Sequence, residues 1–122
     1  MLDSSLERAF DLVDRDVRPL PFKERGIRVT RELIEATLGV LNAEPTKTLP
    51  QNCRNAIMEK TPDGLDRRIK KKLNSNLRTA NIVSDVLRDA GIVEIVKVLN
   101  PQIGRTVKGT RLLNNWMIRH EA

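Results

Sequence analysis

The sequence predicts a single small α+β domain, mostly helical, with a β-hairpin near its C-terminal end. Its 122 residues suffice for one modest core but not for two independent domains. Hydrophobic residues make up 39% of the chain and charged residues 31%, a balance typical of globular proteins. Apolar residues recur at helical spacing along most of the chain, and a run rich in Val and Ile from Ile92 to Leu99 indicates a strand.

The first predicted element is a helix from about Ser4 to Arg18, which Pro19 and Pro21 end. Its apolar seam consists of Leu6, Phe10, Val13 and Val17. Two interpretations stay open: the seam pairs with its copy in a homodimer, or it packs on the chain's own core. Residues 19–28 contain two prolines and a glycine, so we expect a linker that projects before the core begins.

A second helix is predicted over residues 31–42, with Thr30 as its N-cap. Its apolar face is formed by Leu33, Ile34, Leu38 and Leu41. Thr46 to Leu49 is expected to form a short edge strand. A further short helix is predicted over residues 50–60, opened by Pro50 and ended by Pro62.

A basic helix is predicted from Gly64 to Leu73, with Asp63 as its cap. The residues expected to face inward are spaced by four: Leu65, Ile69 and Leu73. The residues expected to point away are all basic: Arg67, Arg68, Lys71 and Lys72. Asn74, Ser75 and Asn76 then break the helix.

The most informative stretch begins at Thr79, whose hydroxyl is placed to cap a helix over residues 79–90. The apolar stripe of this helix is Ile82, Val83, Val86, Leu87 and Ala90. Gly91 follows, where a left-handed residue commonly ends a helix.

The predicted strand from Ile92 to Leu99 leads into a loop punctuated by Asn100, Pro101 and Gly104. Three basic residues lie in or beside this loop: Arg105, Lys108 and Arg111. Gly109 marks a bulge or a close approach in the return strand. Trp116 is expected to close the hairpin onto the core.

Basic residues are concentrated in the second half of the chain. Residues 1–66 carry 10 basic and 12 acidic side chains, whereas residues 67–122 carry 12 basic and 4 acidic ones, so the net charge of +6 arises in the second half. Such an excess suits contact with phosphates. The alternative is a solvated face that keeps the protein soluble.

The order helix, short polar turn, helix, strand, basic loop and strand resembles the winged-helix family of DNA-binding domains. The resemblance implies an α+β winged helix over residues 30–122, with an N-terminal helix and linker over residues 1–29. The basic loop and return strand, residues 100–111, then form the wing. The helix over residues 50–60 is one more than the simplest winged helix needs.

The resemblance makes helix 79–90 the recognition helix and implies a set of DNA contacts. These are Lys70, Lys71, Lys72, Arg78, Thr79, Asn81, Ser84, Arg88, Arg105, Lys108 and Arg111. Asp85 and Asp89 on the same face repel phosphate. Three alternatives stay open: they accept from cytosine, they pair with Arg88, or this face does not enter the groove.

Several other classes of function are disfavoured. The single histidine, His120, has no catalytic or metal-binding partner pattern, and neither GxGxxG nor GxxxxGK[ST] occurs, so we expect neither an enzyme nor a cofactor or metal. The lone Cys53 is expected to pack as a small hydrophobe in a cytoplasmic protein. We expect no secretory signal, and no apolar run approaches the roughly 18 residues of a membrane span.

The expected function is therefore non-catalytic binding of double-stranded DNA, with transcriptional regulation as the usual role of a free-standing protein of this fold. Three aromatic residues are too few for the stacking platforms of single-strand binders, whereas structured RNA stays open. The alternative is a winged-helix adaptor that binds protein through the same face without contacting DNA.

Overall fold

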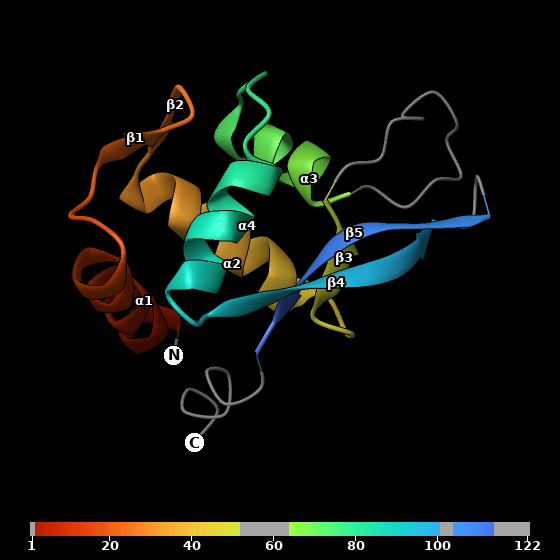
Figure 1. Cartoon of the computed structure of the whole chain (residues 1–122), viewed down its shortest axis with the longest axis horizontal. Coiled ribbons are helices and arrows are strands. Elements are labelled where there is room, and N and C mark those ends of the chain that lie inside the picture. The colour runs from red at the N-terminus through yellow and green to blue at the C-terminus, as the bar shows by residue number, and fades with distance from the viewer. Residues whose placement is uncertain (1, 52–63, 101–103, 114–122) are drawn as a thin grey trace.

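The computed structural model describes residues 2–51, 64–100 and 104–113 (Figure 1). Within these ranges the chain is an α+β structure with four helices and two small antiparallel sheets, which confirms the predicted class. The helices are α1 (Leu2–Asp16), α2 (Arg31–Ala43), α3 (Leu65–Leu73) and α4 (Ala80–Asp89). The strands are β1 (Phe22–Glu24), β2 (Ile27–Val29), β3 (Thr48–Pro50), β4 (Val93–Asn100) and β5 (Arg105–Leu112).

Helix α1 packs its apolar seam into the common core. Leu6, Phe10 and Val13 are buried there and Val17 is half-buried, so the seam packs on the chain's own core. The guanidinium of Arg31 covers the ring of Phe10 at 4.5 Å from its centroid. The apolar seam of α1 is thus occupied within the chain.

The end of α1 carries an exposed ion pair between neighbouring residues. The Arg15 Nε donates a hydrogen bond to Asp16 Oδ1 at 2.8 Å, and this bond holds the pKa of the Asp16 carboxyl below its ordinary value. Both side chains point into solvent, so the pair has little influence on the fold.

Residues 22–29 form the β1–β2 hairpin, so the predicted projecting linker is wrong. Its two-residue turn is made by Arg25 and Gly26, whose φ angles of 50° and 82° are both positive. Two successive positive φ angles are what a type I′ hairpin turn requires. Strand β2 then ends in Val29, which is fully buried in the core.

Two further contacts hold this hairpin against the rest of the protein. Phe22 and Ile27 pack against the core from the same side as Val29. Arg18 donates to the Lys23 carbonyl at 2.7 Å, and its guanidinium lies 4.2 Å from the centroid of the Phe22 ring. The hairpin is therefore a packed element with one outer face.

Helix α2 lies at the centre of the fold, and its predicted cap is confirmed. The Thr30 hydroxyl accepts a hydrogen bond from the Leu33 amide at 3.1 Å. The predicted apolar face is fully buried and comprises Leu33, Ile34, Leu38 and Leu41. The expected edge strand is β3, which begins two residues later and ends one residue later than predicted. Pro50 lies in this strand, so it does not open a helix, and residues 52–60 lie outside the described residues.

Helix α3 begins after Gly64 and buries Leu65 and Ile69 as predicted. Its expected cap, Asp63, lies outside the described residues. Leu73 is 36% exposed, contrary to the prediction, because the helix ends there and Asn74 turns the chain away with a left-handed φ of 51°.

Helix α4 starts on a carboxylate of α3. Asp66 Oδ1 accepts hydrogen bonds from the amides of Thr79 at 3.0 Å and Ala80 at 3.2 Å, and Asp66 Oδ2 lies 3.2 Å from Lys70 Nζ. The Thr79 hydroxyl is buried with no hydrogen-bond partner among the described residues, so its predicted capping role is wrong. The helix dipole also stabilises a negatively charged side chain at the N-terminus of a helix. Asp66 thereby fixes α4 relative to α3.

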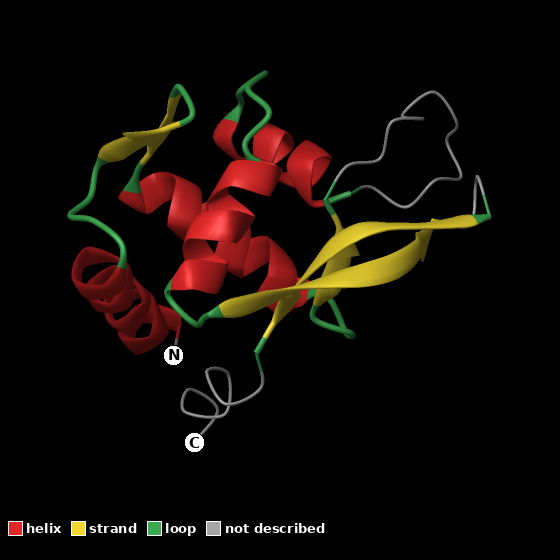
Figure 2. Ribbon diagram, in the orientation of Figure 1, coloured by secondary structure: helices red, strands yellow, loops and turns green. Residues whose placement is uncertain are grey.

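The rest of the α4 region follows the sequence pattern. The predicted apolar stripe is buried: Ile82, Val83, Val86, Leu87 and Ala90. Gly91, with a φ of 75°, ends the helix, and β4 begins two residues later. The β4–β5 hairpin extends away from the group of helices (Figure 2).

Strand β3 pairs with β5, which gives the three-stranded sheet the order β3-β5-β4. Gly109 of β5 sits at the crowded point of this sheet. A Cβ atom on it would lie 2.9 Å from Val98 Cγ2 and 3.1 Å from the Leu49 carbonyl oxygen. The β4–β5 register runs without interruption past Gly109, so this glycine permits a close approach and forms no bulge.

No helix within the described ranges has the length and apolar character needed to cross a bilayer.

Candidate nucleic-acid interface

Helix α4 presents a polar face between two hairpins. The β1–β2 hairpin lies on one side of it and the β4–β5 hairpin on the other (Figure 1). The polar α4 side chains that reach the surface are Asn81, Asp85, Arg88 and Asp89. Arg78, just before the helix, is also exposed.

The two acids on this face are paired with arginines. Asp85 Oδ2 lies 2.7 Å from an Arg25 guanidinium nitrogen, and Asp85 Oδ1 lies 3.6 Å from Arg88. Arg88 also lies 3.3 Å from Asp89. The two acids therefore pair with Arg88, one of the alternatives left open by the sequence, and Asp85 pairs with Arg25 as well. The face is balanced in charge, and its repulsion of phosphate is reduced accordingly.

Two of the predicted contacts are buried, and their assignment as contacts is wrong in this conformation. The Ser84 Oγ lies 2.7 Å from the Thr110 hydroxyl of β5, and both side chains are fully buried. Thr79 is only 6% exposed. Strand β5 covers the Ser84 side of α4, so the buried arc of this helix is wider than its apolar stripe alone indicates.

The register of the β4–β5 hairpin separates the three predicted basic residues of the wing. Successive side chains of a strand alternate between faces, so Lys108 shares the face of Thr110, which contacts α4. Arg105 and Arg111 point to the opposite face. Arg111 pairs there with Glu94, its cross-strand partner. The three residues lie on strand β5, and only Arg105 adjoins the loop.

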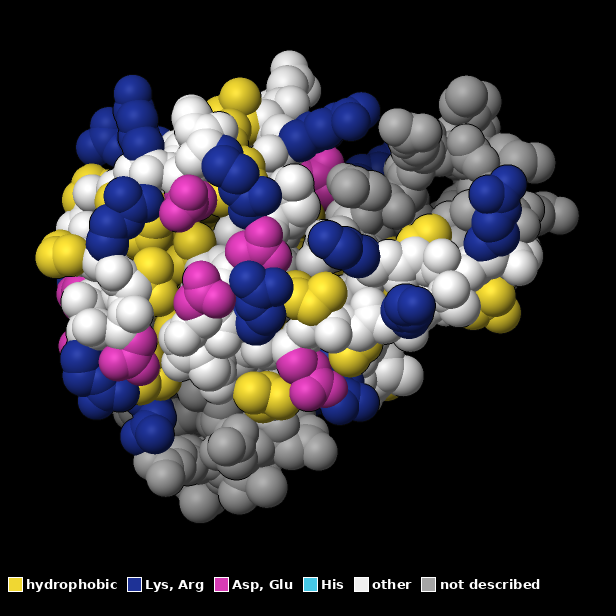
Figure 3. All heavy atoms as spheres, in the orientation of Figure 1, with side chains coloured by type: hydrophobic (Ala, Val, Ile, Leu, Met, Phe, Trp, Pro, Cys, Tyr) yellow, Lys and Arg dark blue, Asp and Glu magenta, His cyan; other side chains and the backbone are white. Residues whose placement is uncertain are grey.

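Lys108 has another cation directly opposite it. The register pairs Lys97 of β4 with Lys108 of β5, and both are exposed. Directly opposed like charges destabilise a sheet, and neither lysine has an ion-pair partner within the described part of the chain. Figure 3, which views the face carrying α4, shows Lys and Arg side chains spaced along this hairpin. An anionic ligand on this face would relieve the repulsion.

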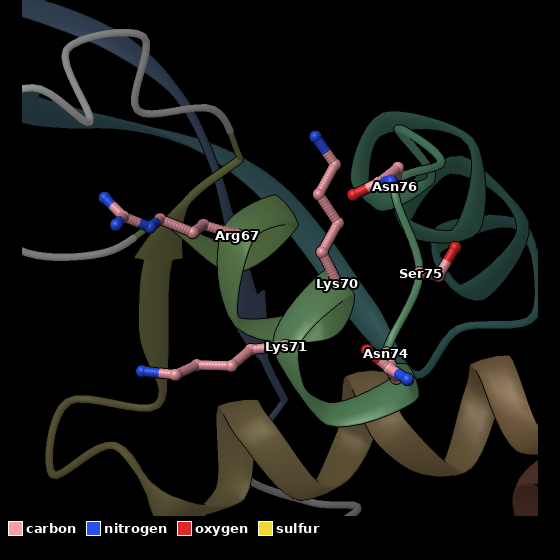
Figure 4. Close-up of a pocket in the computed structure, with 6 residues that line it drawn as sticks. All are labelled: Arg67, Lys70, Lys71, Asn74, Ser75 and Asn76. Atoms are coloured by element: carbon pink, nitrogen blue, oxygen red, sulfur yellow. The ribbon is translucent and has the colours of Figure 1, made fainter.

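The basic helix α3 lines a hollow of about 390 Å³ together with the turn that follows it (Figure 4). Its lining residues are Arg67, Lys70, Lys71, Asn74, Ser75 and Asn76. Lys70 is partly neutralised by Asp66, and the Lys72 side chain extends over Gly39 of α2. The predicted cluster of three lysines is therefore divided, with only Lys70 and Lys71 at the hollow.

The structure adds basic residues to those predicted from the sequence. The strand register places Lys97 opposite Lys108, and the β1–β2 turn brings Arg25 to Asp85 of α4. Within residues 2–51, 64–100 and 104–113, no group of three His, Cys, Asp or Glu residues is placed to hold a metal ion. Cys53, Trp116 and His120 lie outside those residues.

Comparisons with protein-family models, with curated proteins and with solved structures find no match for this chain.

Proposed function

We propose that the chain is a winged-helix protein that binds double-stranded DNA without catalysing a reaction, and that its role is transcriptional regulation. The order of elements supports the first part: α2, β3, α3, α4, β4, loop, β5, with β3 returning to pair with β5. The succession α3, α4, β4 and β5 within this order is the part of the chain on which the sequence resemblance rests. The regulatory role rests on analogy with free-standing proteins of this fold.

The observation that carries the proposal is the opposed pair of Lys97 and Lys108 on the sheet face shared with α4. Two cations held opposite each other are unfavourable in the free protein but suit a phosphate backbone. Lys108 lies on the sheet face whose Thr110 contacts α4, so we expect one duplex to reach both the lysine pair and the polar face of α4. Arg78 and the α3 hollow supply further phosphate contacts, and the exposed Asn81 is suited to a base edge.

The first test is fluorescence anisotropy with a labelled mixed-sequence duplex of about 25 base pairs at several salt concentrations. We expect micromolar binding that weakens steeply with salt. Lys108→Ala should reduce the slope of log Kd against log salt by about 1, because one phosphate contact is lost.

Arg111→Ala is the matched control for this experiment. It removes one positive charge from the same strand, but from the opposite face, where Arg111 pairs with Glu94. Its salt slope should equal that of the unmodified chain. Equal reductions of the salt slope in the two variants would contradict a phosphate contact specific to the α4 face. Absence of duplex binding at low salt would exclude DNA as the partner.

A second candidate function, a winged-helix adaptor for another protein, is favoured by the charge-balanced face of α4. Alternating Asp and Arg side chains suit a protein partner better than a polyanion. Asp85→Asn with Asp89→Asn separates the two candidates, because it frees Arg25 and Arg88. A DNA-binding face should then bind duplex equally or more tightly, whereas a protein interface that uses these carboxylates should weaken.

The homodimer expected as one alternative from the sequence would need a different surface. The apolar seam of α1 is buried within the chain, so pairing through α1 could use only its charged outer side. Two chains bound per duplex, measured by analytical ultracentrifugation of the complex, would support a DNA-dependent dimer.

A further inference from the structure

The β1–β2 hairpin has an outer face made of cations. Strand pairing places Lys23 directly opposite Arg28, and both side chains are exposed. The other face of the hairpin, with Phe22, Ile27 and Val29, packs against the core. Lys23 and Arg28 therefore point outward from a fixed base.

The same unfavourable arrangement thus occurs in both hairpins beside α4. Lys23 opposes Arg28 in one, and Lys97 opposes Lys108 in the other. No ion-pair partner for either member of the Lys23/Arg28 pair lies among the described residues, although Glu24 next to it is paired with Arg18. Directly opposed cations destabilise the free hairpin, and a bound anion would remove this repulsion.

The turn at the tip of the hairpin also contains a cation, Arg25. Arg25 occupies a left-handed position of the turn, with a φ of 50°, where Asn, Asp or Gly is usual. It reaches across to Asp85 on α4 at 2.7 Å, so the hairpin tip borders the exposed face of that helix. Residues held in unusual backbone conformations are often functional, and here the residue held is a cation.

The position of the hairpin defines what it would contact. Figure 3 shows Lys and Arg side chains gathered over β1–β2 at one side of the face and over β4–β5 at the other, with acidic and basic side chains mixed between them. A duplex laid against α4 would therefore meet basic side chains on both flanks. A single-stranded ligand would instead need exposed aromatic rings, and Phe22 of this hairpin is covered by Arg18.

We propose that the β1–β2 hairpin is a second phosphate-binding arm, which grips the duplex backbone through Lys23 and Arg28 on the side of α4 opposite the β4–β5 hairpin. This inference rests on the proposed function, because it names further contacts to the same ligand. In this arrangement α4 lies between two basic hairpins, and the acids on its face are neutralised by Arg25 and Arg88.

The test compares three double variants of the full chain, each lacking two positive charges. Lys23→Ala/Arg28→Ala removes the proposed arm, and Lys97→Ala/Lys108→Ala removes the pair on the other hairpin. Arg8→Ala/Arg15→Ala, on the exposed side of α1, is the matched control. Circular dichroism melting establishes that each variant is folded, which we expect because all six side chains are exposed.

Duplex binding over a range of salt concentrations is the first readout. The arm variant should lower the slope of log Kd against log salt by about 1 to 2, as should the β4–β5 variant, because each loses up to two phosphate contacts. The control should retain the slope of the unmodified chain. If only the β4–β5 variant loses slope, the arm is overturned while the proposed function stands.

Hydroxyl-radical footprinting on the same duplex is the second readout. The arm variant should lose backbone protection on one flank of the site and the β4–β5 variant on the other. Loss of protection on the same flank in both variants would overturn the proposed position of the arm. An equal loss of protection in the α1 control would show that only the net charge of the protein matters, which would also overturn the arm. If the unmodified chain fails to bind duplex at all, the proposed function itself fails. That result differs from failure of the arm alone, in which the unmodified chain still binds.

Discussion

The two hairpins beside α4 are attached to it by different kinds of interaction. The β4–β5 hairpin is joined through buried hydrogen bonds: the Thr110 hydroxyl lies 2.7 Å from Ser84 Oγ of α4 and accepts from Gln51 Nε2 at 3.1 Å. The β1–β2 hairpin is joined through the Arg25–Asp85 ion pair, whose side chains are 51% and 30% exposed. Buried hydrogen bonds fix a geometry, whereas solvated ion pairs exchange readily with water and ions.

This difference predicts that the two hairpins differ in rigidity, although both carry exposed cations. The β4–β5 hairpin, α4 and the residue after β3 share one polar junction in the core, so they are expected to move as a unit. The β1–β2 hairpin keeps its base in the core through Val29 but has a tip held at the surface. We infer that the first hairpin sets where a ligand lies on α4, and that the second adjusts to it.

The largest effect is expected from breaking the buried junction. Thr110→Val leaves the Ser84 hydroxyl and the Gln51 amide buried without their partner. Each of the two stranded groups costs about 1–3 kcal/mol, so the free energy of unfolding should fall by about 2–6 kcal/mol in urea titrations. Arg25→Gln, which breaks the corresponding contact of the other hairpin, should lower it by at most about 1 kcal/mol.

The combination of Ser84→Ala with Thr110→Val controls for simple loss of contact. Removing both hydroxyls leaves fewer unpaired groups, so the double variant should be less destabilised than the sum of the single ones. If Thr110→Val and Arg25→Gln destabilise the chain equally, the two attachments do not differ as described.

A second comparison uses one glycine from each hairpin, Gly109 and Gly26, with Ala substituted at both. Gly109→Ala places a Cβ 2.9 Å from Val98 Cγ2 and 3.1 Å from a backbone oxygen, so we expect a loss of about 2 kcal/mol from overpacking. Gly26→Ala meets nothing within 4 Å, but its φ of 82° is unfavourable for a side chain, and we expect about 1 kcal/mol. Thermal unfolding followed by circular dichroism measures both.

Rescue experiments tell the two causes apart. Val98→Ala should recover part of the stability lost in Gly109→Ala, because it removes the crowding atoms. It should do nothing for Gly26→Ala. Asn at position 26 should be tolerated better than Ala, since Asn adopts left-handed conformations more readily. Partial recovery of both variants by Val98→Ala would show that one shared defect underlies them.

The contrast between the hairpins also explains which parts of the fold could be predicted from the sequence. Helices α2 and α4 and strand β4 carry long local patterns, so the sequence predicted their type and, for the two helices, their buried faces. The β1–β2 hairpin has strands of three residues, too short for clear alternation, and its turn lacks the usual Asn-Gly. The available signal was Gly26 between Phe22 on one side and the alternating apolar residues Ile27 and Val29 on the other.

The candidate interface was less predictable, because its decisive features are tertiary. Asp66 caps α4 from another helix, 13 residues before Thr79, and no local motif announces such a cap. Ser84 is buried because β5 covers it, although on the helix alone it lies beside the polar face. The Lys97–Lys108 pair depends on strand register, which the sequence of a loop does not determine by itself.

The smallest effect is expected from relieving the opposed charges, and its sign is the informative part. Lys97→Gln and Lys23→Gln each remove one member of a directly opposed pair, so each should raise the free energy of unfolding by about 0.2–1 kcal/mol. The gain should shrink at high salt, which screens exposed charges. The same variants should bind duplex more weakly.

Lys97→Glu sharpens this last prediction, because it converts repulsion with Lys108 into attraction across the strands. It should be more stable than Lys97→Gln in urea titrations and should bind duplex least of all. Stability and binding then move in opposite directions along the series Lys, Gln, Glu, as expected where a charge is kept for a ligand at some expense to the fold. A parallel fall of both quantities would mean that Lys97 stabilises the hairpin, and its charge would need another explanation.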